Sequence, residues 1–167
     1  MRRLVPIALV AALGAMGLTA CATVNGPMDM TPEAAPAFVA MAASSDLFEI
    51  ESSRLALQRS QNAMTRMHAQ MMIRDHSNTS AQLRAVAAGA GIGVPIQMLP
   101  MHAALLNDLQ RAGNFDAAYR AQQVTSHQQA LALHDNYARH GDNPQLRGVA
   151  ASAVPIVRGH LDHARRM

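Results

Sequence analysis

The sequence predicts an all-α protein whose main domain is a four-helix bundle with one long crossover connection. The composition is rich in Ala, Gln and Arg and holds few β-branched runs, which favours helices. Apolar residues recur three and four positions apart through most of the chain, as on one face of a helix, and no segment shows the alternation of a strand. The length beyond the first segment fits one domain.

The first twenty residues have the three parts of a bacterial export signal. Arg2 and Arg3 form the positive start, residues 4–18 are apolar, and small residues lead into Cys21. The apolar stretch is shorter than the roughly 20 residues that a membrane span needs. An N-terminal membrane anchor or a buried core helix is the alternative interpretation of this stretch.

Residues 18–21, with the sequence LTAC, resemble the bacterial lipobox. The resemblance implies cleavage before Cys21 and a lipid thioether on its sulfur. We therefore expect a lipoprotein signal peptide over residues 1–20 and a lipidated tether over residues 21–36. Two or more acyl chains give stable membrane anchoring. Ala22 stands where an Asp would commonly signal retention at the inner membrane, so we expect the periplasmic side of the outer membrane.

Cys21 is the only cysteine, so a disulfide framework and a Cys-ligated zinc or iron–sulfur site are excluded. The chain has 14 basic residues, all Arg, against 11 acidic residues, for a formal net charge of +3. Two of the 14 lie in the expected signal peptide. There is no basic run and aromatic residues make up 3%, so a nucleic-acid-binding platform is not expected. Attachment to a membrane is expected to rest on lipid rather than on charge.

The bundle domain is expected over residues 37–167. A first helix is predicted over 36–59, and a second over 62–88, which ends at a glycine-rich segment followed by Pro95. The next segment, 89–114, is too long for a tight turn and carries a short amphipathic helix over 101–111.

Two further long helices are predicted, over 115–139 and 144–166, separated by Gly141 and Pro144. Pro155 lies inside the last helix and should kink it or split it in two. Four long helices with a long link between the second and third have the ferritin-like connectivity rather than the simple up-and-down one.

Four segments in order resemble the motifs of a known family. The set is similar to the ferritin-like family of unknown function in the bacterial envelope, whose members are commonly labelled outer membrane proteins. The match covers about residues 38–166 and implies a four-helix bundle in the envelope without an established activity. The segments are FEIESSRLA at 48–56, MIRDH at 72–76, FDAAY at 115–119 continuing to Gln123 and His127, and 155–164 with His160.

Glu49, His76, His127 and His160 are the positions that this resemblance marks as recurring polar residues. Each falls near the middle of a different long helix, within or beside its apolar stripe. One ligand from each of four facing helices is how bundles build metal sites. Three imidazoles and one carboxylate suit zinc, copper, iron or nickel. The alternative is a hydrogen-bonded network without metal, because burying such groups unpaired would be unfavourable.

Three neighbouring residues are candidates for outer partners of this site: Glu51, Asp75 and Tyr119. Glu49 is preferred to Glu51 on the resemblance alone, since the two point about 200° apart around the helix. We expect Asp75 to pair with an Arg or a helix end, and Tyr119 to pack with its hydroxyl bonded or to reach the site. No Glu stands three residues before His76, so a mononuclear, His-rich site fits better than a di-iron site.

The sequence therefore predicts an envelope lipoprotein that binds a transition metal (zinc, copper or iron) in metal handling or stress protection. The alternative is a structural or interaction protein with a buried His/Glu network. A redox enzyme would need a vacant coordination position on the metal and a channel from solvent. The sequence shows neither feature, so it does not decide whether the protein is an enzyme. The other histidines are expected to be solvated or scattered, and the methionines at helical spacing to be core: His163, His68, His102, His134 and His140, and Met64, Met67, Met71 and Met72.

Overall fold

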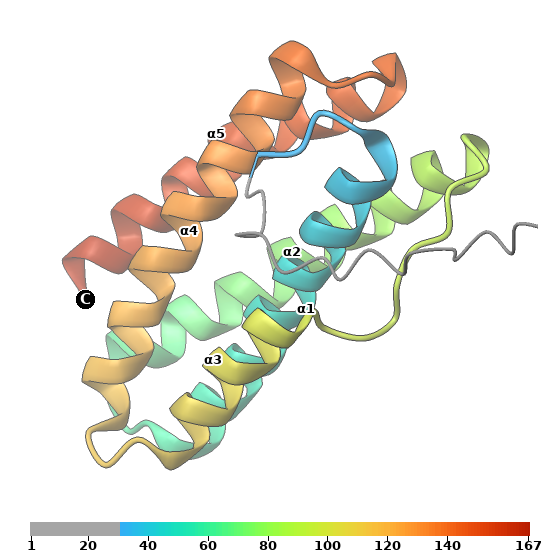
Figure 1. Cartoon of the computed structure of the whole chain (residues 1–167). Helices are drawn as coiled ribbons and strands as arrows, with labels where there is room; N and C mark the ends of the chain where they lie inside the picture. The colour runs from blue at the N-terminus through green and yellow to red at the C-terminus, as the bar shows by residue number, and fades with distance from the viewer. Residues whose placement is uncertain (1–30) are drawn as a thin grey trace, which may run out of the picture.

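A computed structural model describes residues 31–167, so the predicted signal peptide, Cys21 and most of the predicted tether lie outside the described residues. Within 31–167 the chain forms helices and no strand (Figure 1), which confirms the all-α helical bundle. In the same range, no helix is both long and apolar enough for a membrane span. The helices are α1 (Ala35–Arg59), α2 (Ala63–Gly89), α3 (Pro100–Arg111), α4 (Phe115–His140) and α5 (Pro144–Arg166).

Asparagine side chains begin three of the helices. The amide oxygens of Asn62, Asn114 and Asn143 accept hydrogen bonds from the first backbone N–H groups of α2, α4 and α5. The end of α2 is closed by Gly91, whose φ of 71° is the left-handed conformation that glycine adopts without strain. Ile92 N–H then bonds the carbonyl of Ala87, which completes a Schellman cap.

Pro155 lies inside α5, yet α5 continues as one helix, so the predicted split does not occur. Proline cannot donate to the carbonyl four residues before it, which here belongs to Ala151. Both residues are exposed, and water can take the place of the missing donor. The position of Pro155 on the solvent-facing side is what lets the helix continue.

The four long helices pack as two hairpins joined by a crossover. α1 packs against α2 and α4, and α5 packs against α4 and α2. The segment between α2 and α4 returns along the bundle and carries α3, which packs mainly on α1 (Figure 1). The start of α4 therefore lies beside the end of α1, where the Arg59 guanidinium covers the Phe115 ring at 4.8 Å. This is the predicted single crossover.

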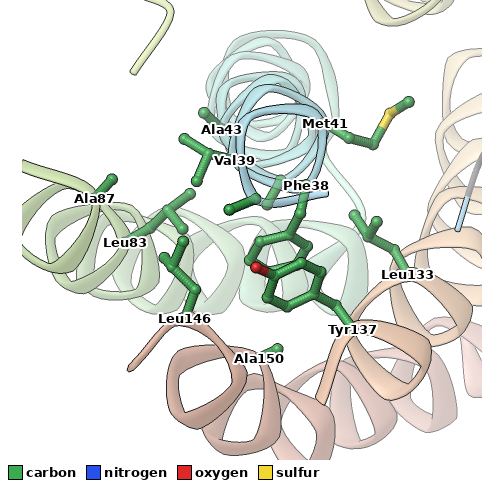
Figure 2. Packing of buried hydrophobic residues seen from close by; sticks show 12 residues of the cluster. Phe38, Val39, Met41, Ala43, Leu83, Ala87, Leu133, Tyr137, Leu146 and Ala150 are labelled. Carbon is green, nitrogen blue, oxygen red and sulfur yellow. The ribbon is translucent and has the colours of Figure 1, made fainter. Parts of the chain in front are cut away.

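Apolar clusters fill the bundle on either side of its middle. In the first, Phe38 of α1 stacks on Tyr137 of α4 with ring centroids 3.9 Å apart, and Leu83 and Leu146 lie beside this pair (Figure 2). The second cluster surrounds Tyr119. Along the helices, the predicted polar positions fall between the two clusters, so the bundle is apolar toward its ends and polar at its centre.

The close approach of Gly141 to Tyr137 gives a test of this packing. A Cβ at Gly141 would lie 2.5 Å from Cε1 of Tyr137, and the buried tyrosine ring is held by its stack on Phe38. We expect Gly141→Ala to lower the free energy of unfolding by about 1–3 kcal/mol. The matched control is Gly148→Ala in α5, where a Cβ meets nothing within 4 Å and helix propensity should add about 0.5–1 kcal/mol. Urea denaturation that ranks Gly141→Ala at or above the parent would contradict the packing described.

Candidate metal centre

Three buried histidines from three helices converge at the centre of the bundle. His76 lies on α2, His127 on α4 and His160 on α5, and none is more than 4% exposed. One potential ligand nitrogen of each lies within 4.8 Å of those of the other two. Their ring centroids are 5.2 to 5.6 Å apart. We call these residues the three-histidine cluster.

Each ring of the three-histidine cluster is held on its outer side by an oxygen atom. These oxygens belong to carboxylates or to a backbone carbonyl, which accept hydrogen bonds and do not donate them. The ring nitrogen that faces each oxygen must therefore carry a proton, and in the neutral ring the lone pair lies on the opposite nitrogen. The pairs are His76 Nδ1 to Asp46 Oδ1 at 2.8 Å, His127 Nδ1 to the Gln123 carbonyl at 2.8 Å, and His160 Nε2 to Asp75 Oδ2 at 3.0 Å.

The opposite nitrogens of the three rings have no hydrogen-bond partner. Within residues 31–167, six buried side-chain polar atoms lack a partner, and three of them are His76 Nε2, His127 Nε2 and His160 Nδ1. Leaving a buried polar group unsatisfied costs about 1–3 kcal/mol. An imidazole whose outer N–H is tied to a carboxylate or carbonyl is the usual form of a metal-ligating histidine. The donor set therefore fits a transition-metal ion.

The electrostatics of the cluster also suit a cation. Burial, together with the neighbouring His76 and His160, holds the pKa of His127 well below its ordinary value. Burial likewise lowers the pKa of His160 to about 4. Burial would lower the pKa of His76 too, but its bond to Asp46 and the charges of Asp46 and Glu49 raise it. The His127 and His160 rings are thus neutral, as coordination requires. The His76 ring lies beside the carboxylates of Asp46 and Glu49.

Glu49 lies beside the three-histidine cluster and is not among the residues whose ligand atoms converge. It is 1% exposed, and the side-chain amide of Gln123 donates a hydrogen bond to Oε2. Oε1 is 3.7 Å from His127 Nδ1, which is the ring nitrogen facing away from the cluster. Burial raises the pKa of Glu49 to about 7, against the opposing effect of His76. Glu51 is the outward residue of the two, with a side chain 40% exposed and paired to Arg54.

Asp75 and Tyr119 take different positions relative to the cluster. Asp75 binds Arg74 at 2.8 Å, as an arginine partner should, and its second oxygen also orients His160 from outside. Tyr119 is buried, and its hydroxyl is 2.8 Å from Ser53 Oγ. Asp75 is therefore an outer partner of the site, whereas the Tyr119 hydroxyl is engaged elsewhere.

Comparison with known proteins places the chain in a family. Residues 20–167 match a family described as a domain of unknown function, DUF4142. The chain belongs to the DUF4142 family. No curated protein matches it. The outer-membrane label in the predicted resemblance stays a prediction.

Solved structures of a protein named CopM resemble this DUF4142 chain. CopM in its Cu(II)-bound form aligns with a TM-score of 0.68 and 19% identity, over 80% of this chain and 94% of CopM. The silver-bound form obtained by co-crystallization gives 0.66 and 18% over 80% and 93%, and the Cu(I)-bound form gives 0.66 and 17% over 79% and 93%. At such identities the likeness shows a shared bundle fold.

Two residues of this DUF4142 chain that contact the cluster were not singled out from the sequence as site residues. Asp46 is 6% exposed and accepts hydrogen bonds from His76 and Thr79. Gln123 is fully buried and contacts Glu49 through its amide group as well as His127 through its carbonyl. Asp46 stands three residues before Glu49 and Gln123 four before His127, so each shares a helix face with a predicted residue. That spacing was the available signal.

Most of the histidines expected to be scattered or solvated are instead packed. His68, His102 and His134 are each at most 9% exposed, and His163 is half-buried. His102 bonds Ser44 at 2.6 Å, while His134 packs edge-on against Phe38. Each long helix packs against two others, so its buried face is wider than the single apolar stripe that the sequence pattern indicates. Histidines beside that stripe are therefore buried as well.

Exposure also separates the methionines that were expected to form one core stripe. Met72 is fully buried, but Met64 and Met67 are 42% and 54% exposed. The core interpretation is therefore wrong for Met64 and Met67. His140 is exposed, as expected.

The burial of His134 predicts acid sensitivity. Burial lowers its pKa to about 4, below the ordinary value of 6.5 that applies in the unfolded chain. Between these values the unfolded state binds a proton that the folded state does not, so stability falls as the pH drops from about 6.5 to about 4. We expect His134→Phe, which keeps a ring against Phe38, to lose less stability over this window than the parent. Urea titrations at several pH values measure the slope, and equal slopes would refute the assignment.

Proposed function

We propose that this DUF4142 chain is an envelope lipoprotein that binds one transition-metal ion at the three-histidine cluster and serves in metal handling. The observation that carries the proposal is the orientation of His76, His127 and His160. Each has one ring nitrogen tied to an oxygen and the other without a partner, and one potential ligand nitrogen of each lies within 4.8 Å of those of the other two. Three convergent lone pairs in a buried site are what a metal ion requires.

Copper is the ion that we favour for this site. Neutral imidazole nitrogen binds copper, zinc, iron and nickel, and affinity among the divalent ions is highest for Cu(II). CopM, which has the same bundle fold, is described in Cu(I)-, Cu(II)- and silver-bound forms. Three imidazoles leave a fourth position open on a tetrahedral ion. Glu49 lies beside the cluster, where Oε2 is bonded to Gln123.

The alternative is a structural or interaction protein whose buried His/Glu groups satisfy one another. Glu49, Gln123 and Asp46 do form such bonds. However, a self-satisfied network should leave few of its own polar atoms without partners. Three ring nitrogens at its centre have none. This observation favours metal binding over the network alone.

Metal binding is tested with the untagged chain, because an affinity tag of histidines would bind copper itself. Cu(II), Zn(II) and Fe(II) are each titrated, and a bound ion at 100 times its Kd should stabilise the fold by about 2.7 kcal/mol. His76→Ala and His127→Ala should weaken binding at the cluster by on the order of 100-fold or more, since loss of even an outer partner costs 10–100-fold.

The matched control is His140→Ala, which removes an exposed histidine of α4 and should leave the affinity and the melting temperature of the loaded protein unchanged. A parent chain that takes up no stoichiometric metal from any of these ions would disprove the proposal. So would variants at His76 and His127 that bind as tightly as the parent.

The lipid anchor is proposed from the sequence around Cys21. Cells grown with a labelled fatty acid should incorporate it into the parent chain, and the labelled protein should sediment with membranes. Cys21→Ser should abolish the label, because the thioether needs the cysteine sulfur, and should leave the signal peptide uncleaved. Label retained in Cys21→Ser, or absent from the parent, would contradict the assignment.

A further inference from the structure

A second pair of histidines lies next to the three-histidine cluster. His68 on α2 and His163 on α5 face each other with their Nδ1 atoms 3.0 Å apart, and their rings stack with centroids 5.0 Å apart. His68 is fully buried, whereas His163 is half-buried. The His68 ring centroid is 6.2 Å from that of His127. The pair thus leads from the partly exposed His163 to the buried cluster.

Gln123 determines which nitrogen of His68 faces its partner. The Gln123 amide nitrogen donates to Glu49, so its amide oxygen is the atom that lies 2.9 Å from His68 Nε2. His68 Nε2 therefore carries a proton, which it donates to that oxygen. Burial lowers the pKa of His68 to about 4, so the ring is neutral at neutral pH. Its lone pair lies on Nδ1, directed at His163.

His163 is the hydrogen-bond donor of the pair, and a cation could take the place of this hydrogen bond. In the metal-free protein, His163 Nδ1–H donates to His68 Nδ1, since the latter has no proton. When His163 instead takes its other neutral tautomer, with the proton on Nε2, the two Nδ1 atoms both offer a lone pair to an ion. Nitrogens 3.0 Å apart subtend about 90° at an ion about 2.0–2.1 Å from each. Two such ligands leave the remaining coordination positions open.

We propose that His68 and His163 form a second, open metal site that captures the ion from solvent and passes it to the three-histidine cluster. The ligand class is a divalent transition-metal ion with affinity for imidazole, and on capture the ring proton of neutral His163 moves from Nδ1 to Nε2 with no net release. The inference rests on the proposed function of the cluster. An open two-ligand site exchanges ions readily, and a buried three-ligand site retains them. The order of the rings from His163 through His68 to His127 matches that direction.

The test measures copper stoichiometry and loading rate on the untagged chain. With Cu(II) as the probe, native mass spectrometry should find two ions on the parent and one on His163→Ala. Rapid mixing should show the buried cluster of His163→Ala filling at least about tenfold more slowly, within the 10–100-fold range typical of disturbed metal sites. His140→Ala, at an exposed position, should behave as the parent.

Two further variants separate metal capture from a structural role. His163→Gln can still donate a hydrogen bond to His68 Nδ1 but supplies no imidazole, so it should fold as the parent and load as slowly as His163→Ala. The double variant His76→Ala/His127→Ala should keep one ion, with two nitrogen ligands in its electron paramagnetic resonance spectrum.

The outcomes distinguish the two proposals. If His163→Ala and His163→Gln match the parent in both stoichiometry and loading rate, the second site is refuted while the three-histidine cluster stands. If the parent binds no copper, zinc or iron, both proposals fail.

Discussion

The hydrogen bonds that tie the outer nitrogens of His76, His127 and His160 to fixed oxygens determine the character of the bundle centre. A buried imidazole has one proton and two nitrogens, so an acceptor on one side decides what the other side offers. Here three acceptors on three helices direct three lone pairs inward. A ring flipped by loss of its acceptor would present an N–H instead, which repels a cation. The chemistry of the site is thus set by residues that do not face its centre.

Gln123 links the two groups of histidines through its backbone carbonyl and its side-chain amide. Its carbonyl holds His127, its side-chain nitrogen bonds Glu49, and its side-chain oxygen fixes the tautomer of His68. In its ionised form Glu49 can only accept, and it then dictates the direction of the side-chain amide. A carboxylate that supplies no ligand atom to the cluster therefore still controls a histidine on another helix. This is a reason for burying Glu49 that does not require it to touch a metal.

The sequence predicted the fold because helix boundaries depend on local signals. Asn62, Asn114 and Asn143 cap helices close to where the apolar pattern begins, and Gly91 ends α2. The length of the segment before Phe115 was enough to indicate the crossover. Pro155 was misjudged in part, because its effect depends on which side of α5 faces solvent.

The candidate site was predictable only where its residues lie on the apolar stripe. His76, His127 and His160 satisfy that condition, and the structure brings them together. Asp46, Gln123 and His68 were missed because their roles are pairwise contacts between helices, and a single sequence does not show which helices are neighbours. Met64 and Met67 show the opposite error. Their helical spacing predicted burial, but both side chains are exposed.

The arrangement of apolar and polar layers explains how such a centre can be tolerated in a small domain. Residues 31–167 contain no cysteine, so their stability comes from packing, and the Phe38–Tyr137 stack and the residues around Tyr119 supply it on either side of the centre. Between them, three unpartnered nitrogens subtract from stability when no ion is bound. A bound ion would reverse the sign of that contribution, because each lone pair would gain a partner in a medium of low dielectric constant. Metal binding at this centre would then be coupled to folding, because the same three nitrogens would gain their partners only in the folded chain.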